Sequence, residues 1–244
     1  LAARRVRRLR HADLARLQQL NAVIQRENYP EAIRLAERAL TLVDERLGGD
    51  PEILLPLLDA LANFHDIAGQ PLQSLPVLQR SLALREKFPA LNTKPAEQAD
   101  TLARLAALHL QRNETREAQR LLKREVEIRR RHGAGAGAEL LRAQGHLLAL
   151  SLEETAMAEP IRRDIRSTAE QASRDVLAVQ MNEANAALAA AIAEGRDRDA
   201  WPAAETCALL APLLHGPDHE STFVCRGNLA EVLRRNRRYE EADT

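Results

Sequence analysis

Aromatic residues are scarce in this chain of 244 residues: Phe, Trp and Tyr make up 2% of the sequence, while 45% of the residues are hydrophobic. The core must therefore be built mainly from Ala and Leu, which allow helices to pack closely and favour the helical conformation. A β-sandwich would need more β-branched and aromatic residues. The composition predicts an all-α protein.

An excess of charge of one sign is also missing. Lys+Arg and Asp+Glu number 35 each, so the formal net charge is zero. Without a global field, nothing draws the chain to nucleic acid or to an acidic membrane, and we expect neither as a partner. Lysine occurs only at Lys87, Lys94 and Lys123. This preference for arginine, together with the excess of alanine, suggests a bacterial, GC-rich genome.

Cysteines and long apolar runs are few as well. Cys207 and Cys225 are the two cysteines, too few for a disulfide scaffold or a cysteine-based zinc site. No run of 18 apolar residues is present, and the residues after Leu1 do not resemble the apolar core of a signal peptide. We expect a cytoplasmic protein, and the missing initiating Met suggests a fragment of a longer one.

Apolar residues recur with the period of a buried helix face. Leu14, Leu17, Leu20 and Ile24 predict one helix, and Tyr29-Pro30 starts a second, because proline fits the first turn of a helix. Its expected buried face is Ala32, Leu35, Ala36, Ala39 and Leu40, and Gly48-Gly49 ends it. Together they predict a helical hairpin.

The same hairpin returns along the chain. Ser74 follows Ala32 by 42 residues, and Ala118 follows Ser74 by 44. Trp201-Pro-Ala-Ala204 repeats the pattern of Tyr29-Pro-Glu-Ala32, and Ala242 opens one more copy. A fourth pair of helices, at about residues 138–175, is placed mainly by spacing. A fixed period of this kind predicts a solenoid of stacked hairpins.

The predicted organisation has two parts. Residues 1–11 form a basic connector helix, and residues 12–244 form an array of about five and a half hairpins, truncated at the C-terminus. The last hairpin stops at Thr244, which leaves Leu229, Ala230 and Leu233 without a complete partner helix. Because natural arrays end in polar capping repeats, we expect the parent protein to continue or another chain to cover this end.

These hairpins resemble tetratricopeptide repeats (TPRs), which have a small residue in the first turn of the second helix. The period, the Gly-Pro-Asp-His loop at 216–219 and the phrase NLAEVLRRNRRYEEA at 228–242 resemble the 42-residue subtype of kinesin light chains and their bacterial relatives. The resemblance implies a right-handed superhelix. Two departures are the run GAGAGA at 133–138 and a second helix after Trp201 that we expect to be a turn shorter than its counterparts.

The resemblance also implies a binding surface. Kinesin light chains bind short cargo peptides on their concave face, with asparagines of an NNLA phrase in the first helices among the contacts. Matching that phrase, Asn228 keeps the asparagine, and other polar residues occupy or follow the equivalent columns. The implied peptide-binding residues are Gln18, Gln19, Asp59, Asn63, Arg104, Asn228 and Arg235.

No motif positions a catalytic centre, and we expect neither an enzyme nor a cofactor. The GAGAGA run follows a charged helix and not a strand, so it predicts a linker and not a phosphate loop. His65 and His109 are expected to be packed and hydrogen-bonded, whereas His215 and His219 bracket a loop where a metal is an alternative. Cys207 and Cys225 are expected on neighbouring helices as buried thiols, with a disulfide as the alternative.

The leading hypothesis is a scaffold that binds a peptide or a partner domain on its concave face, as part of a larger protein. One alternative is a regulatory or sensor segment of a bacterial kinase or transcription regulator, which would bind a small ligand or its own effector domain. Another is self-assembly into a homodimer through array surfaces. The ligand, the parent protein and the oligomeric state are not given by the sequence.

Overall fold

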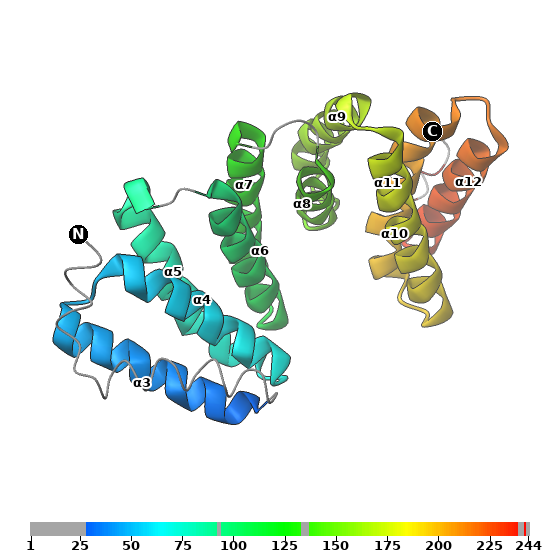
Figure 1. Ribbon diagram of the computed structural model, residues 1–244. Helices are drawn as coiled ribbons and strands as arrows, with labels where there is room; N and C mark the ends of the chain where they lie inside the picture. The colour runs from blue at the N-terminus through cyan, green and yellow to red at the C-terminus, as the bar shows by residue number, and fades with distance from the viewer. Residues whose placement is uncertain (1–27, 92–93, 133–136, 239–241, 243–244) are drawn as a thin grey trace. The chain divides into compact units, whose positions relative to one another are not determined.

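The computed structural model describes residues 28–91, 94–132, 137–238 and 242, and every regular element among them is helical. Within these ranges, ten α-helices and two short 3₁₀-helices follow one another (Figure 1). The prediction of an all-α fold is confirmed. The predicted connector at residues 1–11 and the first predicted helix lie outside the described residues. The chain divides into two compact units, Leu1–Leu121 and Leu122–Thr244, and the boundary falls inside one helix.

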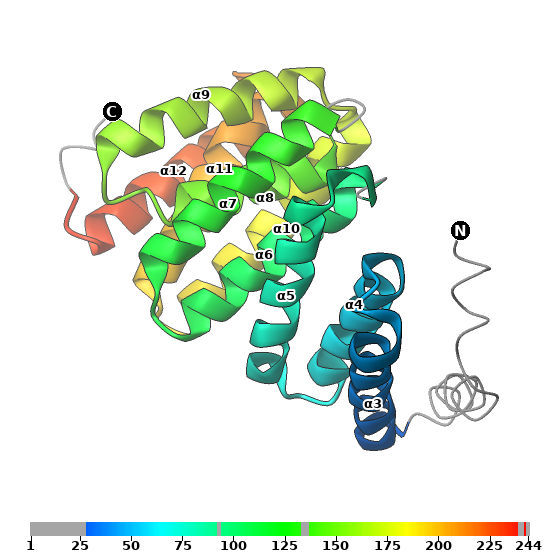
Figure 2. The ribbon, with the colours of Figure 1, turned by 90° about the vertical axis from the view of Figure 1, so that its left-hand side faces the viewer.

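The first unit contains hairpins formed by consecutive helices. They are α3 (Tyr29–Leu47), α4 (Pro51–Ile67), α5 (Ser74–Lys87) and α6 (Pro95–Gln111), with the 3₁₀-helices Pro71–Gln73 and Pro89–Leu91 between them and the first turns of α7 (Thr115–His132) after them. Helix α4 packs against both α3 and α5 (Figure 2). Each helix is therefore covered by its neighbours in sequence, as stacked hairpins require.

The buried face of α3 follows the predicted period. Ala32 and Ala36 are fully buried, and Ala39 and Leu40 are nearly so, whereas Leu35 is only partly buried. Ala32, Ala36 and Leu40 belong to one core cluster with Leu54, Leu58 and other apolar residues of α4. Alanine at these positions lets the two helix backbones approach closely, which explains how a chain with so few aromatic residues fills its core.

Both ends of α3 carry the expected stop signals. Asn28 accepts a hydrogen bond from the Glu31 backbone N–H at 3.4 Å, which satisfies one of the free N–H groups of the first turn. Gly48 adopts a left-handed conformation with φ of 65° and ends the helix.

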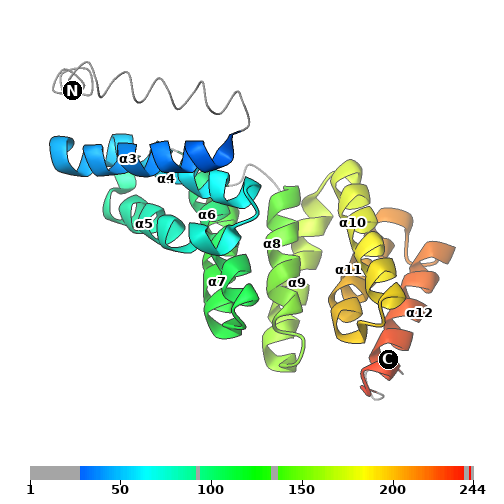
Figure 3. The ribbon, with the colours of Figure 1, turned by 90° about the horizontal axis from the view of Figure 1, so that it is seen from below.

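The second unit holds the rest of α7 and the helices α8 (Ala138–Ala149), α9 (Thr155–Gln171), α10 (Arg174–Ala193), α11 (Asp197–His215) and α12 (Glu220–Arg235). Helix α11 packs between α10 and α12 (Figure 3). The weakly predicted fourth hairpin is present as α8 and α9, with Leu148 and Ile165 among its most deeply buried residues. The GAGAGA run lies mostly outside the described residues.

The prediction of a shortened helix after Trp201 is wrong. Helix α11 has 19 residues, as many as α3, because it begins at Asp197, four residues before the tryptophan. Pro202 therefore lies inside the helix instead of starting it. A proline within the first two turns removes one backbone donor, and here the helix continues through it.

Four of the first helices end in the same backbone closure. The residue after the turn donates its N–H to a carbonyl five residues earlier in four pairs: Gln70 to His65, Glu114 to His109, Arg196 to Ala191, and Arg238 to Leu233, at 2.8–2.9 Å. The residue before each donor has a φ between 61° and 71°. This Schellman arrangement satisfies the free carbonyls at the helix end, and its recurrence is the structural basis of the repeat.

Helix α10 is the one described helix that is long and apolar enough to cross a bilayer. Its buried residues Leu177, Met181 and Leu188 belong to a helix that packs against α11 and α8. A helix that packs against two neighbours in a stacked array also needs many apolar residues, and this packing explains the hydrophobicity of α10.

Candidate functional site

Two predicted contact residues meet in the first unit. Arg104 of α6 donates from Nη1 to Asn63 Oδ1 of α4 at 2.9 Å and from Nη2 to Asp66 Oδ2 at 2.5 Å. The guanidinium thus links equivalent faces of two successive first helices. The Arg104 side chain is 28% exposed, so these groups form a partly accessible polar surface, here called the Arg104 surface.

Asp59 is engaged inside its own hairpin. Its Oδ1 accepts from Ser81 Oγ at 2.8 Å, and its Oδ2 accepts from Arg85 Nη2 at 2.5 Å. The Arg85 side chain is only 3% exposed, and Glu97 also contacts it at 3.2 Å. Because a buried guanidinium needs a compensating carboxylate, Asp59 has a structural task that the sequence did not reveal.

In the next hairpin, formed by α6 and α7, the equivalent arginine pairs with a carboxylate at a different position. Forty-four residues further along, Arg129 stands in the column of Arg85, Glu125 in that of Ser81, and Ala103 in that of Asp59. Glu125, on the second helix itself, accepts from Arg129 Nε at 2.7 Å, and its side chain is 4% exposed. The carboxylate that pairs with the buried arginine has thus moved to the other helix.

In the second unit, a hollow of about 430 Å³ lies between α10, the end of α11 and α12. We call it the asparagine hollow, because Asn182 and Asn185 of α10 and Asn228 of α12 all line it. Its other lining residues are Ala178, Met181, Leu214, His215, Glu220, Ser221, Val224 and Cys225. Of the predicted contact residues, only Asn228 lies here.

The asparagine hollow combines uncharged polar groups with apolar surface. Each carboxamide offers two donors and one acceptor oxygen, the complement of a peptide backbone. Val224 is 53% exposed, and Val179, next to Ala178 on α10, is 50% exposed. A large exposed apolar side chain beside polar groups is typical of a contact surface.

Asn185 is oriented by a buried thiol. Cys207 Sγ donates to Asn185 Oδ1 at 3.2 Å. Burial, together with a smaller effect of the nearby Cys225 thiol, raises the pKa of the Cys207 thiol to about 12, so the group stays protonated and can donate. Both cysteines are buried free thiols, as predicted. Asn185 precedes Cys207 by 22 residues, the same separation as Asp59 and Ser81.

Arg235 lines a different hollow of the second unit, at the turns that end α10 and α12. This hollow of about 600 Å³ is lined by Gly195, Arg196, Asp197, Arg198, Asp199, Arg235, Asn236 and Arg237, and we call it the arginine hollow. Arg235 pairs with Glu231 at 3.0 Å and approaches Asp197 at 3.7 Å. It therefore does not join Asn228.

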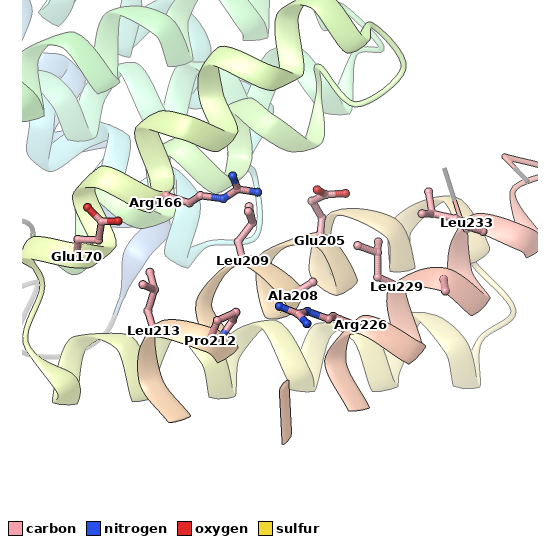
Figure 4. A pocket seen from close by; sticks show the side chains of 12 residues that line it. Arg166, Glu170, Glu205, Ala208, Leu209, Pro212, Leu213, Arg226, Leu229 and Leu233 are labelled. Atoms are coloured by element: carbon pink, nitrogen blue, oxygen red, sulfur yellow. The ribbon is translucent and has the colours of Figure 1, made fainter. Parts of the chain in front are cut away.

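A third hollow, of about 450 Å³, lies over the second helices of the unit. Side chains of α9, α11 and α12 converge there, including Leu209, Leu213, Leu229 and Leu233 (Figure 4). Ala242 also lines it. Leu229 and Ala230 are partly exposed, and Leu233 is buried.

The predicted histidine environments are partly correct. His65 and His109 are both buried. His109 Nδ1 lies 2.5 Å from Glu114 Oε2, but His65 Nδ1 has no hydrogen-bond partner among the described residues, so that half of the prediction is wrong. The rings of His215 and His219 stack with centroids 5.1 Å apart, and His219 Nδ1 accepts from the Ser221 N–H at 3.1 Å. That nitrogen caps α12.

The structure separates the predicted contact residues that it describes into four places. Asp59 contacts Ser81 and Arg85 within the hairpin of α4 and α5. Asn63 and Arg104 meet on the Arg104 surface, Asn228 lies in the asparagine hollow and Arg235 in the arginine hollow. Gln18 and Gln19 lie outside the described residues. Asn182 and Asn185 were missed, because residues 178–189 match the NNLA phrase poorly. Their spacing from Asn228, 46 and 43 residues, was the available signal.

Comparison with known proteins gives similarity at the level of structure. No protein-family model and no curated protein match the chain. A putative kinesin light chain with nearly identical TPR-like repeats, from Podosopora anserina, is similar over 96% of this chain and 92% of its own, with 17% identity and a TM-score of 0.49, and a variant of it gives the same values. BtubC (BKLC) from P. vanneervenii is 16% identical, covering 88% and 87% of the two chains, with a TM-score of 0.45.

Proposed function

We propose that this chain is a non-catalytic, cytoplasmic scaffold that binds a protein segment in the asparagine hollow. The observation that supports this is the grouping of three carboxamides and an exposed valine between two successive first helices. An extended peptide presents a backbone donor and acceptor at each residue, and the side-chain amides of asparagine can pair with both. The valine would then contact one apolar side chain of the peptide.

The character of the hollow favours a peptide over a charged small molecule. Glu220 is the only Asp, Glu, Lys or Arg residue in its lining. Neutral hydrogen bonds contribute about 1 kcal/mol each, so affinity must come from several of them together with apolar burial. This requirement matches a segment that spans the hollow and extends beyond it.

The experiment is a peptide selection with a counter-screen. A random peptide library is panned on the wild-type protein, and recovered peptides are measured by calorimetry on Asn182→Ala/Asn228→Ala. We expect the double variant to weaken binding about tenfold or more, since two hydrogen-bonding groups are lost. Gln171→Ala, which removes an exposed amide of α9 outside the hollow, is the control. Peptides that bind the double variant and the wild type equally would refute the proposal.

The Arg104 surface is proposed as a second contact region in the first unit. Arg104→Ala and Asn63→Ala remove its two linked members. A peptide selected on the wild type that retains full affinity for both variants would count against this region alone. The homodimer stays a prediction, and sedimentation at increasing concentration tests it.

A further inference from the structure

Two of the guanidinium groups that line the arginine hollow form no ion pair within the described residues. Its lining includes four arginines and two aspartates in a chain whose net charge is zero. Arg196 is paired with Glu194, at 2.7 Å, and with Asp199. Arg235 is paired with Glu231. The acidic groups nearest to these two guanidinium groups are thus already engaged.

The other two arginines are different. Arg198 and Arg237 are exposed, and neither forms a hydrogen bond or an ion pair with any residue in the described ranges. Both nevertheless line the hollow. Two guanidinium groups that pair with no carboxylate among the described residues, and that line one concave space, leave ten N–H donors available to a ligand.

The backbone that carries Arg237 is fixed on both sides. Asn236 donates from its side chain to the Asp197 carbonyl at 2.9 Å, which ties the turn after α12 to the start of α11. The Arg238 guanidinium lies 4.8 Å from the centre of the Trp201 ring, and Trp201 is buried. The two walls of the hollow are therefore held together, and Arg237 projects from a defined point between two anchors.

Arg237 also occupies a conformation that does not suit it. Its φ is 61°, in the left-handed region, where equivalent turns have Gly69, Asn113 and Gly195. Glycine and asparagine tolerate this region, whereas arginine is strained there. A residue that costs stability at an exposed turn, and whose side chain pairs with no other described residue, is expected to serve another purpose.

We infer that the arginine hollow is an anion-binding site for a carboxylate- or phosphate-bearing segment of a partner protein. The planar guanidinium binds both groups through two parallel hydrogen bonds, so the shared chemistry is a compact oxyanion. Asp197 and Asp199 also line the hollow, and their negative charge favours a localised acidic group over a continuous polyanion such as nucleic acid. The site is separate from the asparagine hollow, and the inference does not depend on the proposed function.

The test uses fluorescence anisotropy to measure the binding of three labelled peptides, which differ only at the positions that carry the acidic groups. The first carries a short run of glutamates, the second has glutamine in their place, and the third has a single phosphoserine in the glutamine background. We expect the first or the third to bind, with affinity falling as salt is raised, and the second not to bind. The ranking of the first and third identifies the oxyanion, and inorganic phosphate is added as a competitor.

The variants locate the binding. Arg198→Ala/Arg237→Gly removes both unoccupied guanidinium groups, and the glycine keeps the left-handed turn. We expect about tenfold or greater loss of affinity, since charge-assisted hydrogen bonds are lost. Arg163→Ala is the matched control: it removes an exposed α9 arginine that has no described ion pair and lines none of the three hollows. Circular dichroism verifies that each variant is folded.

Three results would overturn the inference. One is that neither acidic peptide binds the wild-type protein. Another is that Arg163→Ala loses as much affinity as the double variant, which would indicate a diffuse charge effect. The last is an oligonucleotide that binds more tightly than both acidic peptides and is sensitive to the same double variant, which would replace the protein segment with nucleic acid as the partner.

Discussion

Replacing Asp59 with alanine tests whether this residue supports the hairpin of α4 and α5. The change removes the acceptor of the Ser81 hydroxyl and one carboxylate of the buried Arg85. Both hydrogen bonds are accepted by the Asp59 carboxylate, and a hydrogen bond to a charged group contributes about 1.5–3 kcal/mol. Glu97 still contacts Arg85 at 3.2 Å and offsets part of the loss. We therefore expect Asp59→Ala to lower the free energy of opening by about 2–4 kcal/mol.

The matched control is Asp44→Ala. Asp44 pairs with Arg80 at 2.6 Å, also between helices of the first unit, but both side chains are about two-fifths exposed, at 41% and 42%. An exposed ion pair contributes about 0–1 kcal/mol. Hydrogen exchange of the α4 and α5 amides measures the opening of this hairpin directly, even if the two units unfold separately. Equal effects of the two variants would refute the reasoning.

A second-site change sharpens the test. The hairpin that contains Glu125 and Arg129 has alanine in the column of Asp59. Asp59→Ala/Ser81→Glu copies that arrangement, because it places the carboxylate four residues before Arg85 on the same helix. We expect it to recover at least half of the lost stability. No recovery would mean that the two hairpins are not equivalent in this register.

Three further outcomes are expected. Cys207 and Cys225 should react with a thiol reagent only after unfolding, because burial raises the pKa of the Cys207 thiol to about 12; rapid reaction of the native protein at pH 8 would contradict this. Gly195→Ala should destabilise by about 1 kcal/mol because φ is 65°, whereas Arg237→Gly should stabilise by up to about 1 kcal/mol; chemical denaturation showing the same sign for both would contradict it. Leu148→Ala should cost about 2–5 kcal/mol by thermal or urea unfolding, since the side chain is fully buried, and a loss under 1 kcal/mol would show that the core collapses around the gap.

The elements of the fold were largely readable from the sequence. Small residues such as Ala32 and Ser74 mark the positions where two helix backbones approach most closely, and both are fully buried. Because each hairpin needs such a position, the spacing of small residues reveals the repeat. The start of α11 was misjudged because proline is usually a first-turn residue, whereas Pro202 is tolerated one turn later. Helix propensity could not show how many residues of α11 precede Pro202.

The candidate sites were less readable, because the task of a polar side chain depends on its tertiary neighbours. Asp59 and Asn185 stand in equivalent columns, yet one carboxylate is held by a buried arginine and one amide is held by a buried thiol. This difference is determined by Arg85, 26 positions after Asp59, and by Cys207, 22 positions after Asn185. Arg198 and Arg237 line the same hollow because the Asn236 side chain ties the turn after α12 to the start of α11. A contact between residues so far apart in the sequence cannot be predicted from local sequence patterns.

The recurring closure of the first helices has a consequence for design. The two backbone hydrogen bonds of each turn do not involve the side chain of its left-handed residue, which is glycine at 69 and 195, asparagine at 113 and arginine at 237. The identity of that residue can therefore vary at a cost of only about 1–2 kcal/mol, while the main chain stays in place. Each such hairpin therefore has one turn position at which a side chain with a chosen functional group can be introduced while the backbone of the array is kept.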